Sequence, residues 1–253
     1  MCQLLGMNAN TPTDVMFSFA GLAHRAEEHK DGFGIAFFEG TGVRLFIDPD
    51  SARASPVAEM VKHYPIRSEQ VIAHIRKATV GRVALQNCHP FVRELWGRYW
   101  VFAHTGDLKG FAPVLHGAFR PVGDTDSELA FCWLMQELAK AHAGVPGVDE
   151  LTRTLRELLP VPAAHGSFNM LLSNGQALWA HASTKLHWLV RQHPFSAATL
   201  ADEDLSVDFA ALTSPRDRVA VIATEPLTAG ERWQAMGAGE LQVFVDGAPR
   251  PLA

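Results

Sequence analysis

The first residues of the chain constrain its fold more than any other stretch. Met1-Cys2 is followed directly by the apolar run Gln3–Met7, which predicts a strand that holds the beginning of the chain inside a sheet. A small second residue favours removal of the initiator methionine, and Cys2 would then carry both a thiol and a free α-amine. That amine, with an ordinary pKa of about 7.7–8.0, is a base for the thiol at neutral pH. Cys2 is therefore a candidate nucleophile; the alternative is an ordinary cysteine at a loose terminus.

The composition is that of an ordinary globular protein. With 253 residues, of which 47% are hydrophobic and 19% charged, the chain is long enough for one large domain or two small ones. It shows no internal repeat, and its one candidate seam, residues 143–147, is better explained as a loop between two helices. We expect a single domain over residues 1–253.

The charge and hydropathy patterns exclude several classes of partner. A net charge of −5 and a pI near 6.2 provide no basic surface for nucleic acid or an anionic membrane. No apolar run approaches the ~18 residues of a transmembrane helix, and no basic segment followed by an apolar one marks a signal peptide. We therefore expect a cytoplasmic protein that binds neither nucleic acid nor membrane.

The cysteines and histidines give no sign of a metal site. Cys2, Cys88 and Cys132 are an odd number without C-x-x-C spacing, which argues against a disulfide scaffold and fits a reducing cytoplasm. The 12 histidines are dispersed without H-x-x-x-H spacing. We expect Cys88 and Cys132 to be small buried residues, and we expect no metal or other cofactor.

Hydrophobic periodicity predicts helices grouped between runs of strands. Helices are expected over Thr13–Arg25, from a capping box at Thr125–Glu128 to about Leu138, and over Asp149–Leu159, which Pro160 ends. Strands are expected at Gly34–Phe38, Val43–Ile47, Val71–Ala78, Trp100–His104, Phe168–Leu172, Ala177–Ala180, His187–Arg191, Val219–Ala223 and Leu241–Val245. Because helices and strands do not alternate strictly, we expect an α+β protein.

Five short stretches follow Cys2 in a fixed order. They are HKDGFGIA at His29–Ala36, HIRKATVG at His74–Gly81, CHPF at Cys88–Phe91, AHTG at Ala103–Gly106 and GDTDSE at Gly123–Glu128. With Cys2 they resemble the class-II glutamine amidotransferases, which are N-terminal nucleophile hydrolases, and most closely the stand-alone bacterial type without a synthase domain. Stretches at Phe168–Gly175 and Ala223–Leu227 extend the resemblance to nearly the whole chain. The resemblance implies a four-layer αββα sandwich of two mainly antiparallel sheets, with Cys2 at a strand end between them.

Arg76 and Asp126 are candidates for recognising the two ends of an amino acid. His74 and Arg76 would share one face of a strand, and the planar fork of Arg76 suits a carboxylate. Asp126 lies in the first turn of a capped helix, where the helix dipole favours its charge. The resemblance implies that Arg76 binds the α-carboxylate of glutamine and that Asp126 binds its α-ammonium group. A structural salt bridge and an ordinary helix-start aspartate are the alternatives.

The resemblance implies further roles for residues in the same motifs. Thr79 and His89 are expected to bind substrate, and His74, His89 and His104 to organise the pocket by hydrogen bonding. Gly106 matches a glycine whose N–H donates to the oxyanion, whereas Thr105 stands where the family has an asparagine that supplies the other donor. A hydroxyl rotates freely, and losing one such donor outright typically costs roughly 10²–10³ in rate. Thr105 replaces the amide in part, a neighbouring group does, or the protein is a slow or silent hydrolase.

The implied reaction is hydrolysis of a γ-glutamyl amide through a Cys2 thioester, releasing glutamate and ammonia. With glutamine as substrate, the ammonia would go to a separate synthase subunit, because this chain has no room for one. Another γ-glutamyl compound, with water as the only acceptor, fits Arg76 and Asp126 equally well. The alternative to an enzyme is a degenerate domain that binds a glutamyl ligand or a protein partner without turnover.

Overall fold

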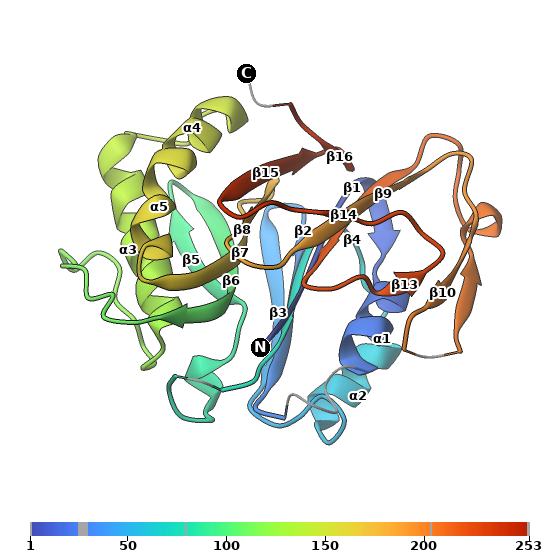
Figure 1. Cartoon of the computed structure of the whole chain (residues 1–253), viewed down its shortest axis with the longest axis horizontal. Helices are drawn as coiled ribbons and strands as arrows, with labels where there is room; N and C mark the ends of the chain where they lie inside the picture. The colour runs from blue at the N-terminus through green and yellow to red at the C-terminus, as the bar shows by residue number, and fades with distance from the viewer. Residues whose placement is uncertain (1, 25–29, 79, 203, 252–253) are drawn as a thin grey trace.

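The computed structural model describes residues 2–24, 30–78, 80–202 and 204–251. Two antiparallel sheets lie face to face, and helices cover both outer faces (Figure 1). This is the four-layer αββα arrangement that the sequence resemblance predicts.

The larger sheet is built around the first strand. Its strands are β1 Gln3–Asp14, β2 Phe33–Glu39, β3 Gly42–Asp48, β4 Arg67–Ile75, β9 His187–Gln192, β12 Arg218–Ala223 and β14 Gln234–Ala235. Within the described residues these seven strands run in the order β14-β9-β12-β1-β4-β2-β3. Because β1 pairs with both β4 and β12, the chain beginning at Cys2 enters the middle of the sheet. Helices α1 (Met16–His24) and α2 (Pro56–His63) pack on the outer face.

The smaller sheet carries the other helices. Its strands are β5 Phe91–Leu95, β6 Arg98–Leu108, β7 Gly166–Ser173, β8 Leu178–Ala182, β15 Glu240–Val245 and β16 Ala248–Pro249. Over the part of the chain that the structure describes, the six run in the order β16-β15-β8-β7-β6-β5. Helices α3 (Asp126–Ala141), α4 (Val148–Leu158) and the short α5 (Pro160–Ala163) cover its outer face. The loop expected at residues 143–147 does connect two helices, α3 and α4.

The layer between the sheets follows from strand alternation. Side chains of one strand point to opposite faces in turn, so Ile72 of β4 faces the smaller sheet while Val71 and Ala73 face the helices. Likewise, Val101 and Ala103 of β6 face the larger sheet, and Phe102 faces α3. This alternation turns the first residues of β1 and the last residues of β6 toward one another.

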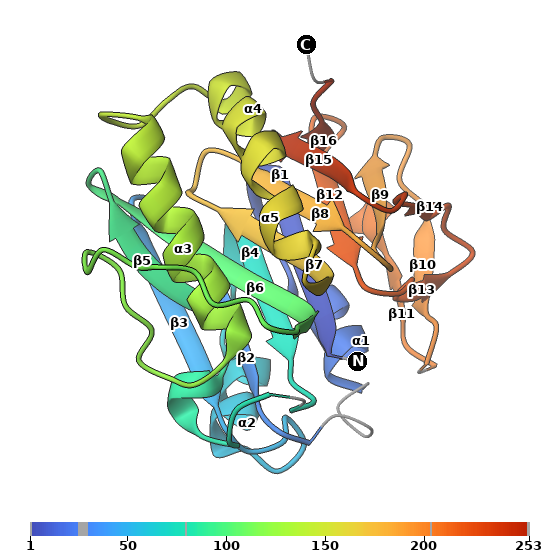
Figure 2. The ribbon, with the colours of Figure 1, turned by 60° about the vertical axis from the view of Figure 1, so that its left-hand side comes forward.

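Several elements were not predicted from the sequence: the edge strands β5, β14 and β16, the short helix α5 and two larger features. One is helix α2, which begins behind Ser55, whose hydroxyl accepts hydrogen bonds from the N–H groups of Val57 and Ala58. The other is a small three-stranded sheet beside α1, formed by β10 Ala197–Leu200, β11 Ser206–Asp208 and β13 Thr228–Ala229 (Figure 2). Single 3-10 turns span Leu85–Asn87 and Phe209–Ala211. The strands β10, β11 and β13 are too short to show a clear alternation of apolar and polar residues in the sequence.

Several predicted element boundaries were wrong: β1 continues past Met7 to Asp14, and β4 begins at Arg67 instead of Val71. Tertiary contacts explain two further differences. The helix expected from Thr13 begins at Met16, because Thr13 and Asp14 continue β1 against β4 and the Asp14 carboxylate accepts the Met16 N–H at 2.7 Å. The strand expected over Val71–Ala78 ends at Ile75, because the Ala78 N–H turns away to the Asp31 carboxylate, at 2.8 Å. Arg76 therefore lies just beyond the strand end.

Candidate functional site

Cys2 is held at the entrance of β1 by the peptide groups on either side of Lys77. Its Sγ donates to the Lys77 carbonyl at 3.2 Å and accepts from the Lys77 N–H at 3.1 Å. Partial burial raises the pKa of the Cys2 thiol, opposed by the Lys77 backbone hydrogen bond and the positive charge of Arg76. The thiol is therefore protonated at neutral pH, and a base is required to make it a nucleophile.

Thr105 contacts the backbone of Cys2 across the two sheets. Its side chain is 1% exposed, and its hydroxyl donates to the Cys2 carbonyl oxygen at 3.2 Å. The contact joins the end of β6 to the beginning of β1, as the strand alternation requires. The single hydroxyl proton of Thr105 is thus used in a hydrogen bond within the protein.

Gly106 occupies a position where no side chain fits. A Cβ there would lie 1.7 Å from the Ser167 carbonyl oxygen and 2.7 Å from Nε2 of His104. The close pairing of β6 with β7, in which Gly106 lies opposite Phe168, leaves this space only for glycine. Strand packing alone therefore requires glycine at position 106, independently of any role of its N–H.

Arg76 is buried, and its guanidinium binds backbone carbonyls. The side chain is 3% exposed; its terminal nitrogens donate to the carbonyls of Val80 (3.1 Å), Gly81 (3.3 Å), Arg82 (3.0 Å) and Asp31 (3.4 Å). This holds residues 80–82 over the end of β4. A carboxylate that binds the same nitrogens has to share them with these carbonyls or displace them.

Asp126 is the first residue of α3 and joins the helix to β6. One carboxylate oxygen accepts the Leu108 N–H at 2.7 Å, and the other accepts the Ser127 N–H at 2.8 Å. The preceding Thr125 caps the helix through the Glu128 N–H, at 3.2 Å. The Glu128 carboxylate does not turn back to Thr125 as in a closed capping box; it binds the loop before the helix and pairs with Arg93.

His104 links α3 to the paired strands β6 and β7. Its Nδ1 lies 2.8 Å from the Ser127 hydroxyl, and its Nε2 lies 3.1 Å from the Ser167 carbonyl oxygen. Burial lowers the pKa of His104, opposed by the charge of Asp126. The neutral ring can donate its one N–H to the Ser167 carbonyl and accept a hydrogen bond from the Ser127 hydroxyl at its other nitrogen. His104 thus organises this region by hydrogen bonding, as expected.

His89 stacks beside a second histidine. Its ring centroid lies 4.2 Å from that of His74 and 4.4 Å from that of Phe91. Neither ring nitrogen of His89 has a hydrogen-bond partner among the described residues, although the side chain is only 4% exposed. Burial first, and then the neighbouring His74, His104 and Arg76, hold the pKa of His89 well below its ordinary value. Both ring nitrogens are enclosed by protein, so a ligand can reach them only if the residues around the ring move.

The remaining expectations can be placed briefly. Thr79, His29 and Met1 lie outside the described residues. Cys88 and Cys132 are buried, as expected. The described part of the chain contains no group of three or more His, Cys, Asp or Glu side chains arranged to hold a metal ion. It also contains no helix long and apolar enough to span a membrane.

Sequence reasoning missed three residues that hold the site together. Lys77 acts through its backbone, which no side-chain pattern reveals. Thr224 continues the β1–β12 pairing, since its hydroxyl accepts the Leu4 N–H at 2.9 Å. Asn169, fully buried, accepts the N–H groups of residues 183–185 and donates to Thr184 and to the Thr105 carbonyl. A lone amide in the apolar run Phe168–Leu172 was the available signal for Asn169. Both N–H donors of Asn169 are thus used within the protein.

Comparisons with known proteins agree with this geometry. A family profile described as glutamine amidotransferases class-II matches residues 1–253. YafJ of Escherichia coli (strain K12), which is named as a glutamine amidotransferase, is 50% identical over 251 residues and 98% of each chain. The crystal structure of a predicted glutamine amidotransferase from Pseudomonas aeruginosa PA01 is 42% identical, with a TM-score of 0.79 over 98% of this chain and 99% of that one.

A more distant structure shares the fold alone. The glutamine phosphoribosylpyrophosphate amidotransferase of Bacillus subtilis is 14% identical, with a TM-score of 0.63, over 98% of this chain and 48% of that one. The full-length matches to stand-alone proteins, the family profile and the two facing sheets all indicate the same family. The chain belongs to the class-II glutamine amidotransferases.

Proposed function

We propose that this protein hydrolyses a γ-glutamyl amide with Cys2 as the N-terminal nucleophile. The observation that supports this most directly is the meeting of three distant segments at the beginning of β1. Cys2 Sγ contacts the backbone of Lys77, next to Arg76, and the Cys2 carbonyl accepts the hydroxyl of Thr105. A thiol, a cation and a strand end with a close-packed glycine are thereby assembled in one place.

The proposed steps conserve every atom and proton. Removal of Met1 frees the α-amine of Cys2, which takes the proton of the thiol. The thiolate attacks the amide carbon, and the C–N bond breaks as the leaving nitrogen receives the proton, releasing ammonia or an amine. Water then attacks the γ-glutamyl thioester, releasing glutamate and restoring the thiol. The raised pKa of the thiol makes such a base necessary near pH 7.

Recognition of the glutamyl end is assigned to Arg76 and Asp126, and Thr79 and His89 are further candidates for binding it. The fork of Arg76 suits the α-carboxylate, and the carboxylate of Asp126 suits the α-ammonium group. Both side chains bind backbone groups of the protein. We propose that the glutamyl end displaces some of these contacts and that His89 contributes a hydrogen bond once the residues that enclose its ring have moved.

Gly106 and Thr105 are the proposed hydrogen-bond donors to the oxyanion. The N–H of Gly106 is the proposed backbone donor. Thr105 has one proton, which binds the Cys2 carbonyl, so donation to an oxyanion requires its hydroxyl to rotate away. We therefore propose slow turnover, without a cofactor, by a single cytoplasmic domain over residues 1–253. Ammonia from glutamine would pass to a separate synthase subunit.

The engaged hydroxyl of Thr105 also favours a second candidate, a glutamyl-binding domain without turnover. Intact mass and a hydrolysis assay distinguish the two. The enzyme hypothesis expects a mass lacking one methionine and ammonia release from glutamine or another γ-glutamyl amide, lost by at least about 10³-fold in Cys2→Ala. The matched change Cys132→Ala, on the buried face of α3, should retain the activity. Retained Met1, with glutamate binding and no turnover of any γ-glutamyl amide, would instead establish the binding domain.

A further inference from the structure

Asn87 is a buried amide that joins the loop over Arg76 to the segment before α3. Its side chain is 0% exposed, and its Nδ2 donates to the Arg82 carbonyl at 2.9 Å and to the Asp124 carboxylate. Its Oδ1 accepts the Asp124 N–H at 3.0 Å. Both ends of the amide are therefore used, and one side chain holds the loop and the beginning of the helix together.

The backbone is closely packed around this amide. A Cβ at Gly123 would lie 2.0 Å from Oδ1 of Asn87, and a Cβ at Gly81 would lie 3.2 Å from its Nδ2. Gly81 also has a φ of +77°, in the left-handed region that glycine adopts without strain. Glycine at these two positions lets both backbone segments approach Asn87.

The carbonyl of Arg82 has two donors, and it is here that Asn87 meets the candidate site. Nη1 of Arg76 donates to this oxygen at 3.0 Å, and Nδ2 of Asn87 donates at 2.9 Å. A part-buried carbonyl that loses its only donor within the protein is destabilising. Because Asn87 remains bound, the Arg82 carbonyl keeps a hydrogen bond when Arg76 turns to a ligand carboxylate.

The other contacts of Asn87 reach the acidic end of the site. Asp124 lies two residues before Asp126, and Thr125 between them caps α3. Because Asn87 binds both the N–H and the carboxylate of Asp124, it fixes the loop relative to the first residue of α3. The Arg82 side chain adds only an exposed ion pair with Asp124, at 3.6 Å, and such pairs contribute little.

We propose that Asn87 is a positioning residue for recognition of the glutamyl end. It allows Arg76 to exchange a backbone carbonyl for the α-carboxylate while the loop stays in place relative to Asp126. The proposal rests on the glutamyl recognition proposed above for Arg76 and Asp126. Because Asn87 acts through Arg76, it should affect the affinity for ligands that carry an α-carboxylate and leave the chemistry at Cys2 unchanged.

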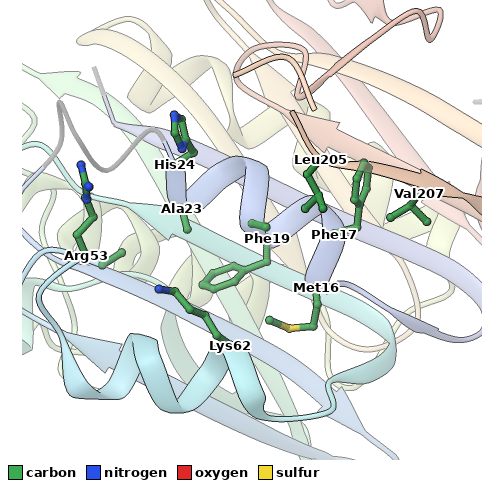
Figure 3. A pocket seen from close by; sticks show the side chains of 11 residues that line it. Met16, Phe17, Phe19, Ala23, His24, Arg53, Lys62, Leu205 and Val207 are labelled. Carbon is green, nitrogen blue, oxygen red and sulfur yellow. The ribbon is translucent and has the colours of Figure 1, made fainter. Parts of the chain in front are cut away.

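An open cavity of about 560 Å³ beside α1 lies between that helix, α2, the segment before α2 and β11 (Figure 3). The described residues that line it are apolar or basic, with no carboxylate among them. A glutamyl ligand needs an anion for its ammonium group as well as a cation for its carboxylate. The described lining therefore lacks the pair of charges that Arg76 and Asp126 provide.

Nuclear magnetic resonance titration of the whole chain tests the proposal with two ligands. They are glutamate and 4-aminobutyrate, which is glutamate without its α-carboxylate. Asn87→Ala should weaken glutamate binding about tenfold and change the affinity for 4-aminobutyrate less than about twofold. The KM for glutamine should rise about tenfold as well, with kcat changed less than about twofold.

A second background tests whether Asn87 acts through Arg76. In Arg76→Met, which by itself weakens glutamate binding, the further change Asn87→Ala should leave the remaining affinity unchanged. A general loosening of the site would instead lower the affinity in both backgrounds.

The matched control is Asn8→Ala. Asn8 is another buried amide, 1% exposed, and lies further along β1 from Cys2. Its Oδ1 accepts the Gly247 N–H at 2.7 Å, so its loss also breaks a buried hydrogen bond to backbone. The change should lower the free energy of unfolding and leave the glutamate affinity as in the wild type.

The outcomes separate this proposal from the proposed function. Equal weakening of both ligands by Asn87→Ala, an unchanged glutamate affinity, or a further loss in the Arg76→Met background would overturn the role of Asn87 alone. A wild type that binds no glutamate and hydrolyses no γ-glutamyl amide would refute the recognition by Arg76 and Asp126, and the role of Asn87 with it.

A measurement on the wild type decides the question should Asn87→Ala fail to fold by circular dichroism. The side-chain N–H signals of Asn87 should stay protected from solvent exchange when glutamate is bound, because Nδ2 keeps both acceptors. Loss of that protection on binding would show that Asn87 leaves the Arg82 carbonyl together with Arg76, and would overturn the proposal.

Discussion

The two sheets contribute differently to the candidate site. On the larger-sheet side, Cys2 is held by the peptide groups of Lys77 and Arg76 by the carbonyls of residues 80–82, all beyond the end of β4. The smaller-sheet side supplies Gly106 from β6 and Asp126 from α3, and these are fixed by paired strands and by the His104–Ser127 contact. One side depends on a loop, and the other depends on regular secondary structure.

This difference indicates which side adapts to a ligand. A loop that binds Arg76 through carbonyls can exchange those contacts for a carboxylate at little cost to the fold, because the described residues 80–82 belong to no strand. The β6–β7 pairing and the start of α3 cannot shift without breaking buried hydrogen bonds. We expect the larger-sheet side to rearrange on binding, while the smaller-sheet side provides a fixed frame.

The largest effect is expected from Gly106→Ala, which tests whether the smaller-sheet side is rigid. The new Cβ would meet the Ser167 carbonyl at 1.7 Å, so β6 and β7 have to separate. We expect a loss of at least about 4 kcal/mol in the free energy of unfolding, measured by urea denaturation. The control Gly110→Ala, at φ +70° with nothing within 4 Å, should cost only about 1 kcal/mol. Similar costs for the two changes would mean that β6 and β7 adapt easily.

Arg76→Met tests the loop on the other side. The change removes the four contacts to backbone carbonyls, which are partly accessible to water, and we expect a loss of about 2 kcal/mol in stability. Faster hydrogen exchange should be confined to residues 76–82. The exposed Arg153→Met on α4 is the control and should change neither quantity. Faster exchange spreading into β6 would show that the two sides are not independent.

The buried histidines give the site a pH dependence of stability. The pKa values of His89 and His104 are lowered in the folded protein, so the unfolded chain binds more protons below about pH 6.5. The free energy of unfolding should therefore fall as the pH drops below about 6.5, by up to about 1.4 kcal/mol per pH unit for each histidine. His89→Phe keeps the ring stacking and should reduce the dependence of unfolding free energy on pH by up to about 1.4 kcal/mol per pH unit. A slope unchanged in His89→Phe would show that this ring is protonated without opening the fold.

The smallest effect is expected from Thr105→Asn, which changes the contact between the two sides. An amide has two N–H donors and can serve both the Cys2 carbonyl and an oxyanion, whereas the Thr105 hydroxyl has one proton. We expect kcat for the preferred γ-glutamyl amide to rise by up to about tenfold. Thr105→Val, which keeps the shape and removes the donor, should not raise it. A fall in kcat for Thr105→Asn would mean that the hydroxyl has a role that an amide cannot fill.

Much of the architecture was predictable, but the contacts within the site were not. The αββα layers followed from the resemblance carried by short motifs, and the long strands and helices followed from periodicity. Strand alternation predicted that His74 and Arg76 share one face of a strand, but Arg76 proved to lie past the strand end. The engagement of Thr105 with the Cys2 carbonyl depends on two strands that are 103 residues apart in sequence, so no local pattern could reveal it.

By itself, the sequence determined the family, the cysteine that opens the first strand and the periodic elements, because these depend on residue types and on spacings of a few positions. Only the tertiary structure decided that Lys77 holds the thiol through its backbone and that Arg76 binds loop carbonyls. It also decided that the Thr105 hydroxyl binds the Cys2 carbonyl across the two sheets. Such contacts join backbone groups and side chains far apart along the chain, and their positions are fixed only when the sheets pack.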